Sequence, residues 1–241
     1  MGYVDLHCHL LWDLDDGCVS AEETLAVSRA LVRCGYTDVA PSPHVQERYP
    51  GGDARRSRER LAEARELLDR SGVALALHSG AENMLDQVFI ARATAGEARG
   101  IGRDGRYALL EVPFLELVPD LPDLVRAVRA AGVTPLLAHP ERCVEFVRRG
   151  RAEEVAREGV LLQLNLGALT GRHGRQAQML AERFLDLGLY AVAGTDLHGP
   201  EEAEAWVEEA LERLAQRAGE ATLCRLCDEN PRRVLAGHPL V

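Results

Sequence analysis

The stretch Tyr3-Val-Asp-Leu-His-Cys-His9 reads as a short β-strand that ends in two histidines. Side chains alternate along a strand, so His7 and His9 lie on one face and Cys8 lies on the other. Alone, the His-x-His spacing is a weak signal, and a structural pair of histidines is an equally simple interpretation. It gains weight because five later strand-like segments also end in histidine or acidic residues, which predicts a site assembled from many strand ends.

Short β-rich runs alternate with amphipathic helical stretches along the chain. The predicted strands are residues 3–8, 36–41, 73–81, 107–112, 133–138, 160–165 and 189–194. The predicted helices are residues 20–34, 54–71, 86–98, 120–131, 143–158 (broken at Gly150), 173–187, 201–217 and 220–235. Five glycines stand just before the next strand, as expected of residues that end helices: Gly35, Gly72, Gly132, Gly159 and Gly188. Ser20-Ala-Glu-Glu23 predicts a capping box at the first helix.

Strand–helix alternation at this spacing predicts a parallel sheet. An open, doubly wound sheet is one possible form, and it places a ligand site at a single switch point between two or three strands. Here the candidate residues follow the first, second, third, fourth, fifth and seventh strands, which only a closed sheet brings together. We therefore predict an α/β fold, a (β/α)7 barrel with its chemistry at the C-terminal rim, in a single domain covering residues 1–241.

The composition excludes several classes of protein. A net charge of −10 without a basic block argues against nucleic acid or an anionic membrane surface as the partner. The chain has no lysine, which excludes a Schiff-base lysine, a P-loop lysine and a carbamylated metal-bridging lysine. No long apolar run or leader-like segment is present, so no membrane insertion is expected. The six cysteines lack the spacing of a disulfide framework, which predicts a cytoplasmic protein.

Nine histidine and acidic side chains at or just beyond the strand ends are candidate metal ligands. They are His7, His9, Asp16, His44, Glu82, Glu111, His139, Asp196 and His198. Glu111 lies in the apolar run Tyr107-Ala-Leu-Leu-Glu-Val112, where a lone carboxylate is costly unless a cation neutralises it. Imidazoles and carboxylates without a thiolate suit Mn²⁺, Fe²⁺ or Zn²⁺. Nine ligands suit two or three ions, and such a centre is suited to phosphoryl displacement.

Seven short motifs together resemble the polymerase-and-histidinol-phosphatase (PHP) superfamily, above all its capsular-polysaccharide branch of manganese-dependent bacterial protein-tyrosine phosphatases. The motifs are Asp5-Leu-His-Cys-His9, Asp15-Asp-Gly17, Ser42-Pro-His44, Gly80-Ala-Glu82, Leu110-Glu-Val-Pro-Phe114, His139-Pro-Glu-Arg142 and Thr195-Asp-Leu-His198. The segment Asn165-Leu-Gly-Ala-Leu-Thr-Gly171 is similar to the sixth-strand segment of that branch. Each motif is short, but the combination is specific and runs from about residue 3 to residue 200.

The resemblance implies a distorted, TIM-like (β/α)7 barrel of the PHP fold that hydrolyses phosphotyrosine at a trinuclear centre, with manganese as the expected metal. It assigns His7, His9, Glu82 and Asp196 to one ion, Glu82, Glu111 and His139 to a second, and Asp16, His44 and His198 to a third. By the same resemblance a metal-bridging hydroxide attacks phosphorus, and Arg142 contacts the phosphate. The implied partner is a phosphotyrosine protein, a bacterial tyrosine kinase of exopolysaccharide or capsule synthesis.

One departure from the branch concerns phosphate binding. Its members usually carry another arginine shortly after the final Asp-x-His, whereas here Gly199-Pro-Glu-Glu-Ala203 follows and the next arginine is Arg213. Arg48, Arg172 and Arg175 are alternatives that the sequence does not rank, and loop arginines are usually solvated surface.

Other interpretations compete with this one. Cys143-Val-Glu-Phe-Val-Arg-Arg149 matches the C-x5-R spacing of cysteine-dependent phosphatases, but its bulky residues suit a helix better than a phosphate-binding loop. A metal-dependent amidohydrolase commonly needs the lysine that this chain lacks. A PHP phosphatase for histidinol phosphate or a nucleotide, a polymerase-associated exonuclease and a non-catalytic, metal-stabilised binding protein are the further alternatives. Cys224-x-x-Cys227 is interpreted as two buried thiols rather than half of a zinc site.

Overall fold

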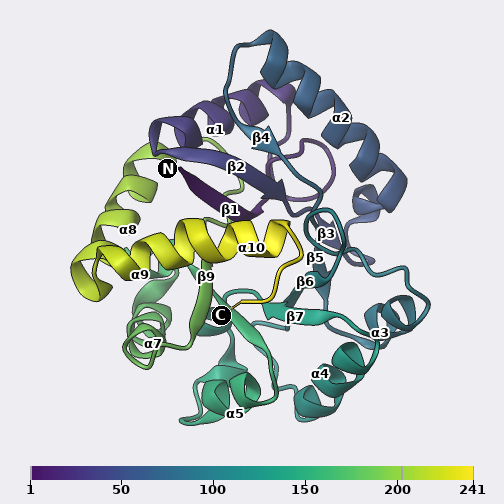
Figure 1. Cartoon of the computed structure of the whole chain (residues 1–241), viewed down its shortest axis with the longest axis vertical. Coiled ribbons are helices and arrows are strands. Elements are labelled where there is room, and N and C mark those ends of the chain that lie inside the picture. The colour runs from purple at the N-terminus through teal and green to yellow at the C-terminus, as the bar shows by residue number, and fades with distance from the viewer. Residues whose placement is uncertain (1, 202, 241) are drawn as a thin grey trace.

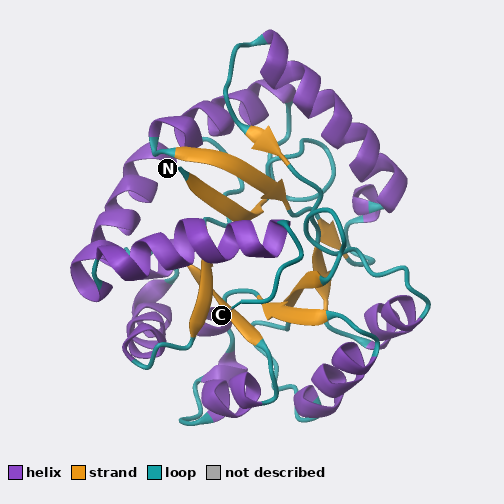
Figure 2. Cartoon of the chain, viewed as in Figure 1, coloured by secondary structure: helices purple, strands orange, loops and turns teal. Residues whose placement is uncertain are grey.

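Helices and parallel strands alternate along the chain in the computed structural model, which describes residues 2–201 and 203–240. The strands are β1 (Tyr3–Cys8), β2 (Tyr36–Pro41), β3 (His44–Val45), β4 (Ala76–Leu77), β5 (Glu82–Met84), β6 (Tyr107–Glu111), β7 (Thr134–Leu137), β8 (Leu161–Asn165) and β9 (Tyr190–Gly194). The helices are α1 (Ala21–Arg33), α2 (Ala54–Arg70), α3 (Gln87–Thr94), α4 (Leu121–Ala130), α5 (Arg151–Arg157), α6 (Leu166–Leu169), α7 (Gly174–Asp186), α8 (Ala203–Ala218), α9 (Glu220–Cys224) and α10 (Asn230–Leu235). Most helices lie around the outside of the strands (Figure 1), so the strands form a central layer (Figure 2).

The strands form a closed barrel. Parallel pairing runs from β1 through β2 to β4, and from β3 through β5, β6, β7 and β8 to β9. Since β2 and β3 are consecutive parts of one barrel strand, as are β4 and β5, the two sheets are one surface. The ring closes beyond β9, where the His9 amide donates to Leu197 O at 2.8 Å and the Asp196 amide donates to His7 O at 2.7 Å. The predicted seven-stranded barrel is confirmed, and the open sheet is excluded.

Two barrel strands are interrupted, which the sequence did not predict. Residues 73–81 were expected to form one strand, but only Ala76–Leu77 pairs with β2, and β5 begins at Glu82. The physical reason lies in the neighbouring second barrel strand, because its Pro41 and Pro43 have no N–H to donate to the third. Gly80 permits the close approach there, since a Cβ at this position would lie 2.7 Å from Pro41 O.

The helix ends follow the predicted capping pattern with one difference. All five glycines predicted to end helices have positive φ, the conformation that glycine adopts without strain. The Ser20 side chain accepts from the Glu23 amide at 3.3 Å, as predicted. In a capping box the Glu23 carboxylate would accept from the Ser20 backbone N–H. It accepts from the Val19 backbone N–H instead, so this half of the prediction is wrong by one residue.

The C-terminal segment covers the end of the barrel at which the strands begin. The predicted helix at residues 220–235 is present as a continuous run of α9, a π-helical turn (Arg225–Glu229) and α10, and only the π-helical turn, which precedes Pro231, was not predicted. Figure 1 shows α10 crossing over the strands. Arg232 donates to Gly2 O at 2.7 Å, and the Tyr107 hydroxyl donates to His238 O at 2.7 Å. Because this end is covered, the opposite rim is left for a site.

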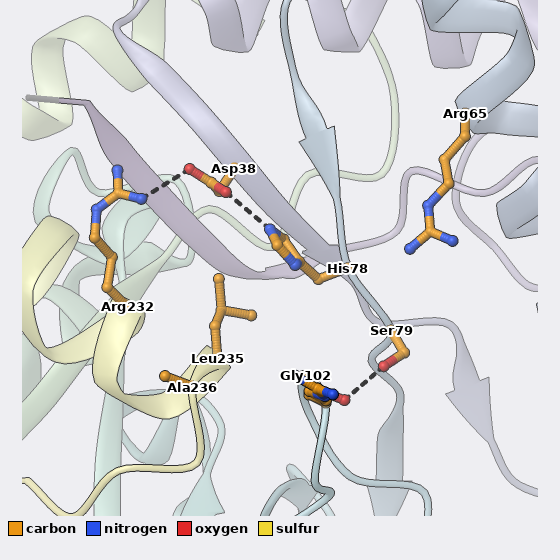
Figure 3. Close-up of a pocket in the computed structure, with 9 residues that line it drawn as sticks. Asp38, Arg65, His78, Ser79, Gly102, Arg232, Leu235 and Ala236 are labelled. Carbon is orange, nitrogen blue, oxygen red and sulfur yellow. Dashed lines mark hydrogen bonds and ion pairs between the residues drawn. The ribbon is translucent and has the colours of Figure 1, made fainter.

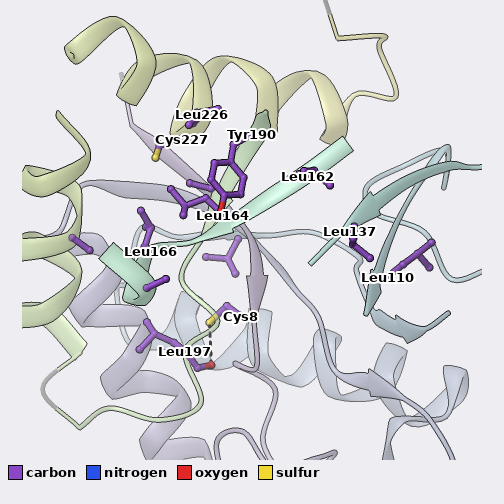
Figure 4. Packing of buried hydrophobic residues seen from close by; sticks show 14 of the residues in the cluster. Cys8, Leu110, Leu137, Leu162, Leu164, Leu166, Tyr190, Leu197, Leu226 and Cys227 are labelled. Carbon is purple, nitrogen blue, oxygen red and sulfur yellow. Dashed lines mark hydrogen bonds between the residues drawn. The ribbon is translucent and has the colours of Figure 1, made fainter. Parts of the chain in front are cut away.

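Aliphatic side chains fill the core between barrel and helices. Figure 4 shows Leu164 next to Tyr190, with Leu162 and Leu166 on either side of it along the same segment, and all four belong to the buried cluster. Burying each such leucine contributes about 1.5–3 kcal/mol. No helix of the described residues has the length and apolar character needed to cross a membrane.

Candidate metal centre

All nine predicted ligands lie at the rim where the strands end. Four strands carry a ligand within their bounds: His7 is the penultimate residue of β1, His44 begins β3, Glu82 begins β5 and Glu111 ends β6. The others lie near the end of β1 or on the loops after β1, β7 and β9. Their ligand atoms form four groups in which all atoms lie within 4.8 Å of one another: His9, Asp16, His44 and His198; His7, Glu82 and His139; His7, His9 and Asp196; His44, Glu82 and Glu111.

The innermost ligands are His7, His9, Glu82 and Asp196. Nε2 of His7 lies 3.1 Å from Oδ1 of Asp196 and 3.2 Å from Oε2 of Glu82. Nε2 of His9 lies 3.4 Å and 3.3 Å from the same two oxygens. Two imidazoles and two carboxylates therefore face one point, which is a donor set that first-row divalent metals prefer.

A buried oxygen of Glu82 tests whether this set fits a cation. Oε2 of Glu82 receives no hydrogen bond from any described residue, although it also lies 3.3 Å from Nδ1 of His44. Buried carboxylate oxygens are normally hydrogen-bonded, so each exception needs an explanation. A divalent ion shared with the surrounding imidazoles supplies one, and the donor set fits such an ion.

The remaining ligands extend the centre toward solvent. Nε2 of His139 lies 3.0 Å from Oε1 of Glu82. Nε2 of His44 and Nε2 of His198 each lie 3.5 Å from Oδ1 of Asp16, whose side chain is 47% exposed. Oε1 of Glu111 lies 3.0 Å from Nδ1 of His44, and Glu82 groups with both of them as well as with His139.

Opposite charges nearby outweigh burial in setting the pKa values of the buried histidine and carboxylate ligands. Burial disfavours a charged His7, but the Glu82 and Asp196 carboxylates outweigh it and raise its pKa well above the ordinary value. Burial also disfavours a charged Glu82, yet His7 and His139 hold its pKa well below the usual range. The carboxylates are therefore ionised and available to a cation.

A glutamine behind the ligands fixes an imidazole, and no sequence motif reveals it. Oε1 of Gln163, in β8, lies 3.1 Å from Nδ1 of His7 and accepts the His139 amide at 3.2 Å. An amide oxygen only accepts, so Nδ1 of His7 carries a proton and Nε2 is the nitrogen that would bind a metal, once the metal displaces the Nε2 proton.

Asp15 orients the second imidazole in the same way. Its Oδ2 accepts from Nδ1 of His9 at 2.8 Å and from the His44 amide at 2.9 Å. The two acids of Asp15-Asp-Gly17 therefore have different positions, one behind the ligands and one among them. Gly17 is required by the close approach of the chain, because a Cβ there would lie 2.3 Å from His9 O. The Asp-Asp-Gly motif signalled this region but not the position of Asp15.

Two ligand positions carry left-handed backbone conformations. His139 has φ 36° and Asp196 has φ 57°, and neither is glycine. Such conformations cost about 1–3 kcal/mol each and concentrate at functional sites. The carbonyl of Asp196 also lies 2.9 Å from Nδ1 of His198, which turns Nε2 of that imidazole toward Asp16.

Arg142, the predicted phosphate contact, lies at the edge of the inner ligands. Its guanidinium donates to the Asp196 carboxylate, and it lies 4.5 Å from the centre of the Phe114 ring. Its neighbour Glu141 points into the protein instead, where it accepts from the Asn165 amide at 2.7 Å and from the Tyr190 hydroxyl at 2.9 Å. Burial raises the pKa of Glu141 to about 7. The His-Pro-Glu-Arg motif thus places Arg142 at the rim and Glu141 beneath it.

A cavity of about 450 Å³ opens beside the centre. Asp16, Asp196 and His198 line it, together with Arg172 and Trp206. The Arg172 guanidinium lies 5.0 Å from the centre of the Trp206 ring. Of the three arginines that the sequence left unranked, Arg172 is therefore the one that shares a cavity with the ligands.

The other two arginines lie elsewhere. Arg48 lies 5.3 Å from the centre of the Tyr49 ring and lines a separate pocket with Asp13. Arg175 is exposed at the start of α7 and does not line the cavity beside the centre.

A second cavity of about 470 Å³ lies at the covered end of the barrel (Figure 3). Asp38 pairs there with Arg232 at 2.9 Å and with His78 at 2.8 Å. None of the nine candidate ligands lines it. These contacts join β2 to α10, which is a structural role.

The competing cysteine mechanism is not supported by the geometry. Cys143 is buried, its thiol lies against Val112 O at 3.8 Å, and burial raises its pKa well above the ordinary value. A protonated, inaccessible thiol is not a nucleophile. Cys227 is buried as predicted, whereas Cys224 is only half-buried and lies 3.6 Å from Glu229, which corrects the prediction of two buried thiols.

Comparison with known proteins agrees with the geometry. A family model described as capsular polysaccharide synthesis, CpsB/CapC, matches residues 3–236. The chain belongs to the CpsB/CapC family. It is 27% identical over 196 residues to CapC of Staphylococcus aureus, which covers 81% of this chain and 76% of that protein. It is 24% identical over 217 residues to the tyrosine-protein phosphatase YwqE of Bacillus subtilis, which covers 90% of this chain and 85% of that protein.

The fold of this CpsB/CapC family member is also found among solved structures. It matches a structure from a study of YwqE of Bacillus subtilis and CpsB of Streptococcus pneumoniae, described as metal-dependent tyrosine phosphatases. The TM-score is 0.91 at 23% identity, over 99% of this chain and 96% of that chain. The barrel is therefore the fold of that enzyme group.

Proposed function

We propose that this CpsB/CapC family member is a metal-dependent phosphomonoester hydrolase that removes phosphate from phosphotyrosine in a protein, with residues 1–241 as a single catalytic domain. The observation that carries the proposal is the convergence of nine imidazole and carboxylate ligands, without a thiolate, around the buried Oε2 of Glu82. The relatives named tyrosine-protein phosphatases support the same activity.

We assign the ligands to two or three divalent ions, with Glu82 shared because it groups both with Glu111 and with His139. His7, His9, Glu82 and Asp196 would hold the first ion, Glu111 and His139 would complete a second at Glu82, and Asp16, His44 and His198 would hold a third. Manganese is the metal we propose, with iron and zinc as alternatives. Bound ions of this kind supply Lewis acidity and an activated water for phosphoryl displacement.

The residues around the centre then bind and orient the substrate. Arg142 and Arg172 would contact phosphate oxygens, a task that suits the planar guanidinium. The half-exposed Phe114 ring packs on Arg142 and offers an apolar surface to the tyrosyl ring. Gln163 and Asp15 keep the inner imidazoles in the tautomer that a metal needs.

The partner and the location are also part of the proposal. We propose that the substrate is a bacterial tyrosine kinase of exopolysaccharide or capsule synthesis and that hydrolysis takes place in the cytoplasm. The family description, capsular polysaccharide synthesis, supports a substrate that belongs to capsule synthesis.

A small phosphate ester is the second candidate substrate. The cavity of about 450 Å³ beside His198 has room for a compound such as histidinol phosphate or a nucleotide. The same ligands would serve either substrate, so only comparative kinetics separate them.

The decisive experiment combines metal analysis with a substrate panel. Protein purified without chelator should contain more than one equivalent of divalent metal. It should hydrolyse a phosphotyrosine peptide with a higher kcat/KM than a phosphoserine peptide, histidinol phosphate or a nucleotide. A preference for histidinol phosphate or the nucleotide would favour the second candidate, and metal-loaded protein without activity on any of them would favour a binding protein.

A further inference from the structure

A separate cavity of about 800 Å³ lies next to the metal centre, between α2 and α3. Gln46 and Tyr49 line it and also contact the candidate ligands. Nε2 of Gln46 donates to Glu111 at 3.0 Å, and the Tyr49 hydroxyl donates to Asp16 at 2.6 Å. A chain bound across the centre would therefore continue directly into this cavity.

Three arginines, Arg58, Arg92 and Arg99, line this cavity. None of them forms an ion pair with a carboxylate of residues 2–201 or 203–240. The pattern differs from that of neighbouring arginines on α2, since Arg55 pairs with Glu59 at 3.0 Å and Arg56 pairs with Asp13 at 3.0 Å. We call Arg58, Arg92 and Arg99 the arginine cluster.

Arg99 is the most enclosed member of the arginine cluster. Its guanidinium donates to Gly52 O, a neutral acceptor. Burial, together with the positive charges of Arg58 and Arg92, lowers its pKa to about 10, although the Asp53 carboxylate acts in the opposite direction. A guanidinium that is enclosed, faced by like charges and hydrogen-bonded to a carbonyl has no ion-pair partner among the described residues.

The carboxylates that line the cavity compensate the arginine cluster only in part: Asp53 partly offsets the charge of Arg99 but forms no ion pair with it. Asp53 and Asp86 are N-caps, and each accepts backbone N–H groups at the start of α2 or α3. Glu47 and Glu97 line the cavity but form no ion pair with the arginine cluster in the described part of the chain. An external anion would complete the cluster.

We propose that the arginine cluster binds acidic side chains that flank the phosphotyrosine in the protein substrate. The proposal rests on the proposed function, because it places the same substrate across the centre and into the neighbouring cavity. Carboxylates on the flanking segment fit the guanidinium fork. The cluster thereby selects acidic sequence around the phosphorylated residue, while a small aryl phosphate does not reach it.

The test compares peptides that differ only in the flanking charge. One phosphotyrosine peptide carries glutamates on both sides, its partner carries glutamines, and para-nitrophenyl phosphate serves as a substrate without flanks. The enzyme variant is the double substitution Arg58→Gln with Arg92→Gln, both exposed positions. Arg55→Gln is the matched control on α2, because Arg55 does not line the cavity.

The wild type should prefer the glutamate peptide in kcat/KM by about tenfold at low salt, and added salt should reduce the preference. The double variant should lose the preference and keep its rate on para-nitrophenyl phosphate, while Arg55→Gln should behave as the wild type. An equal preference in wild type and double variant would overturn the proposal.

A binding measurement separates this proposal from the proposed function. Fluorescence anisotropy of the two peptides, with phenylalanine in place of phosphotyrosine, reports the flanks without hydrolysis. Tighter binding of the glutamate peptide, lost in the double variant, supports the cluster even if the protein hydrolyses no phosphotyrosine. Equal binding of both peptides to the wild type would reject it even if hydrolysis is efficient.

Discussion

Oε1 of Gln163 lies 3.1 Å from Nδ1 of His7, and the same oxygen accepts the backbone N–H of His139 at 3.2 Å. One buried amide in β8 therefore positions ligands that come from β1 and from the loop after β7. Outer residues of this kind set the tautomer and the angle of a metal-binding imidazole.

Replacing this amide should weaken metal binding. We expect Gln163→Met to reduce ion affinity by about 10–100-fold, because the thioether sulfur is only a weak acceptor for the proton of Nδ1. Competition with a fluorescent chelator measures the affinity. Gln178→Met is the control, since Gln178 bonds to Leu169 O and not to a ligand. Unchanged affinity would mean that Gln163 does not orient His7.

Metal removal should abolish hydrolysis. A chelator is expected to stop phosphotyrosine hydrolysis and added Mn²⁺ to restore it, whereas Cys143→Ser should retain nearly the wild-type rate. The reason is that the Cys143 thiol is buried and protonated. Activity that survives chelation but disappears in Cys143→Ser would show that hydrolysis depends on the cysteine and not on a metal.

Loss of Arg142 should affect substrate more than metal. We expect Arg142→Ala to lower kcat/KM for a phosphotyrosine peptide by about 10–100-fold, equivalent to about 1.5–3 kcal/mol for a charge-assisted hydrogen bond, with metal content unchanged. Arg142→Lys should recover only part of this, because an ammonium lacks the two-pronged geometry. If Arg142→Ala matches the wild type, phosphate is held without this side chain.

Arg172 should supply a second phosphate contact. Its guanidinium lies over Trp206 in the cavity beside His198, so Arg172→Ala is expected to raise KM for the phosphotyrosine peptide by about tenfold. Arg175→Ala, three residues away at the exposed start of α7, is the control. Equal effects of the two substitutions would indicate a general loss of positive charge instead of a specific contact.

His173 should contribute to the pH dependence of stability. Burial and the neighbouring Arg142 lower its pKa to about 4, below the ordinary value of 6.5. Between these values the unfolded chain binds the extra proton, so the free energy of unfolding falls as the pH drops from 6.5 to 4 and is unaffected by this group above 6.5.

His173→Asn should therefore flatten that decline. Urea unfolding at pH 7 and pH 5, with metal removed, measures the difference, and His238→Asn at an exposed position is the control. The other charged groups around His173 are Arg142, Arg172, Asp196 and His139, and they are the same in both proteins. An identical decline in the wild type and His173→Asn would contradict the prediction.

Local sequence patterns predicted most of the fold. Glycines such as Gly35 and Gly132 mark helix ends because only glycine adopts positive φ there without strain. The alternation of short apolar runs and amphipathic stretches located β1 and β6 within a residue of their observed bounds. The break between β4 and β5 was missed, because it depends on prolines in the neighbouring barrel strand and not on residues 73–81 themselves.

The sequence by itself determined the candidate ligands and the barrel, since period-two spacing and parallel strand ends place His7, Glu111 and Asp196 on one rim whatever the details of packing. The tertiary structure decided which other side chains contact these ligands and which line the neighbouring cavity. Gln163 is 156 residues from His7 in sequence, and the arginine cluster joins α2 to the segment after α3. Such contacts depend on how the barrel closes and how the helices pack, which no local pattern of residues encodes.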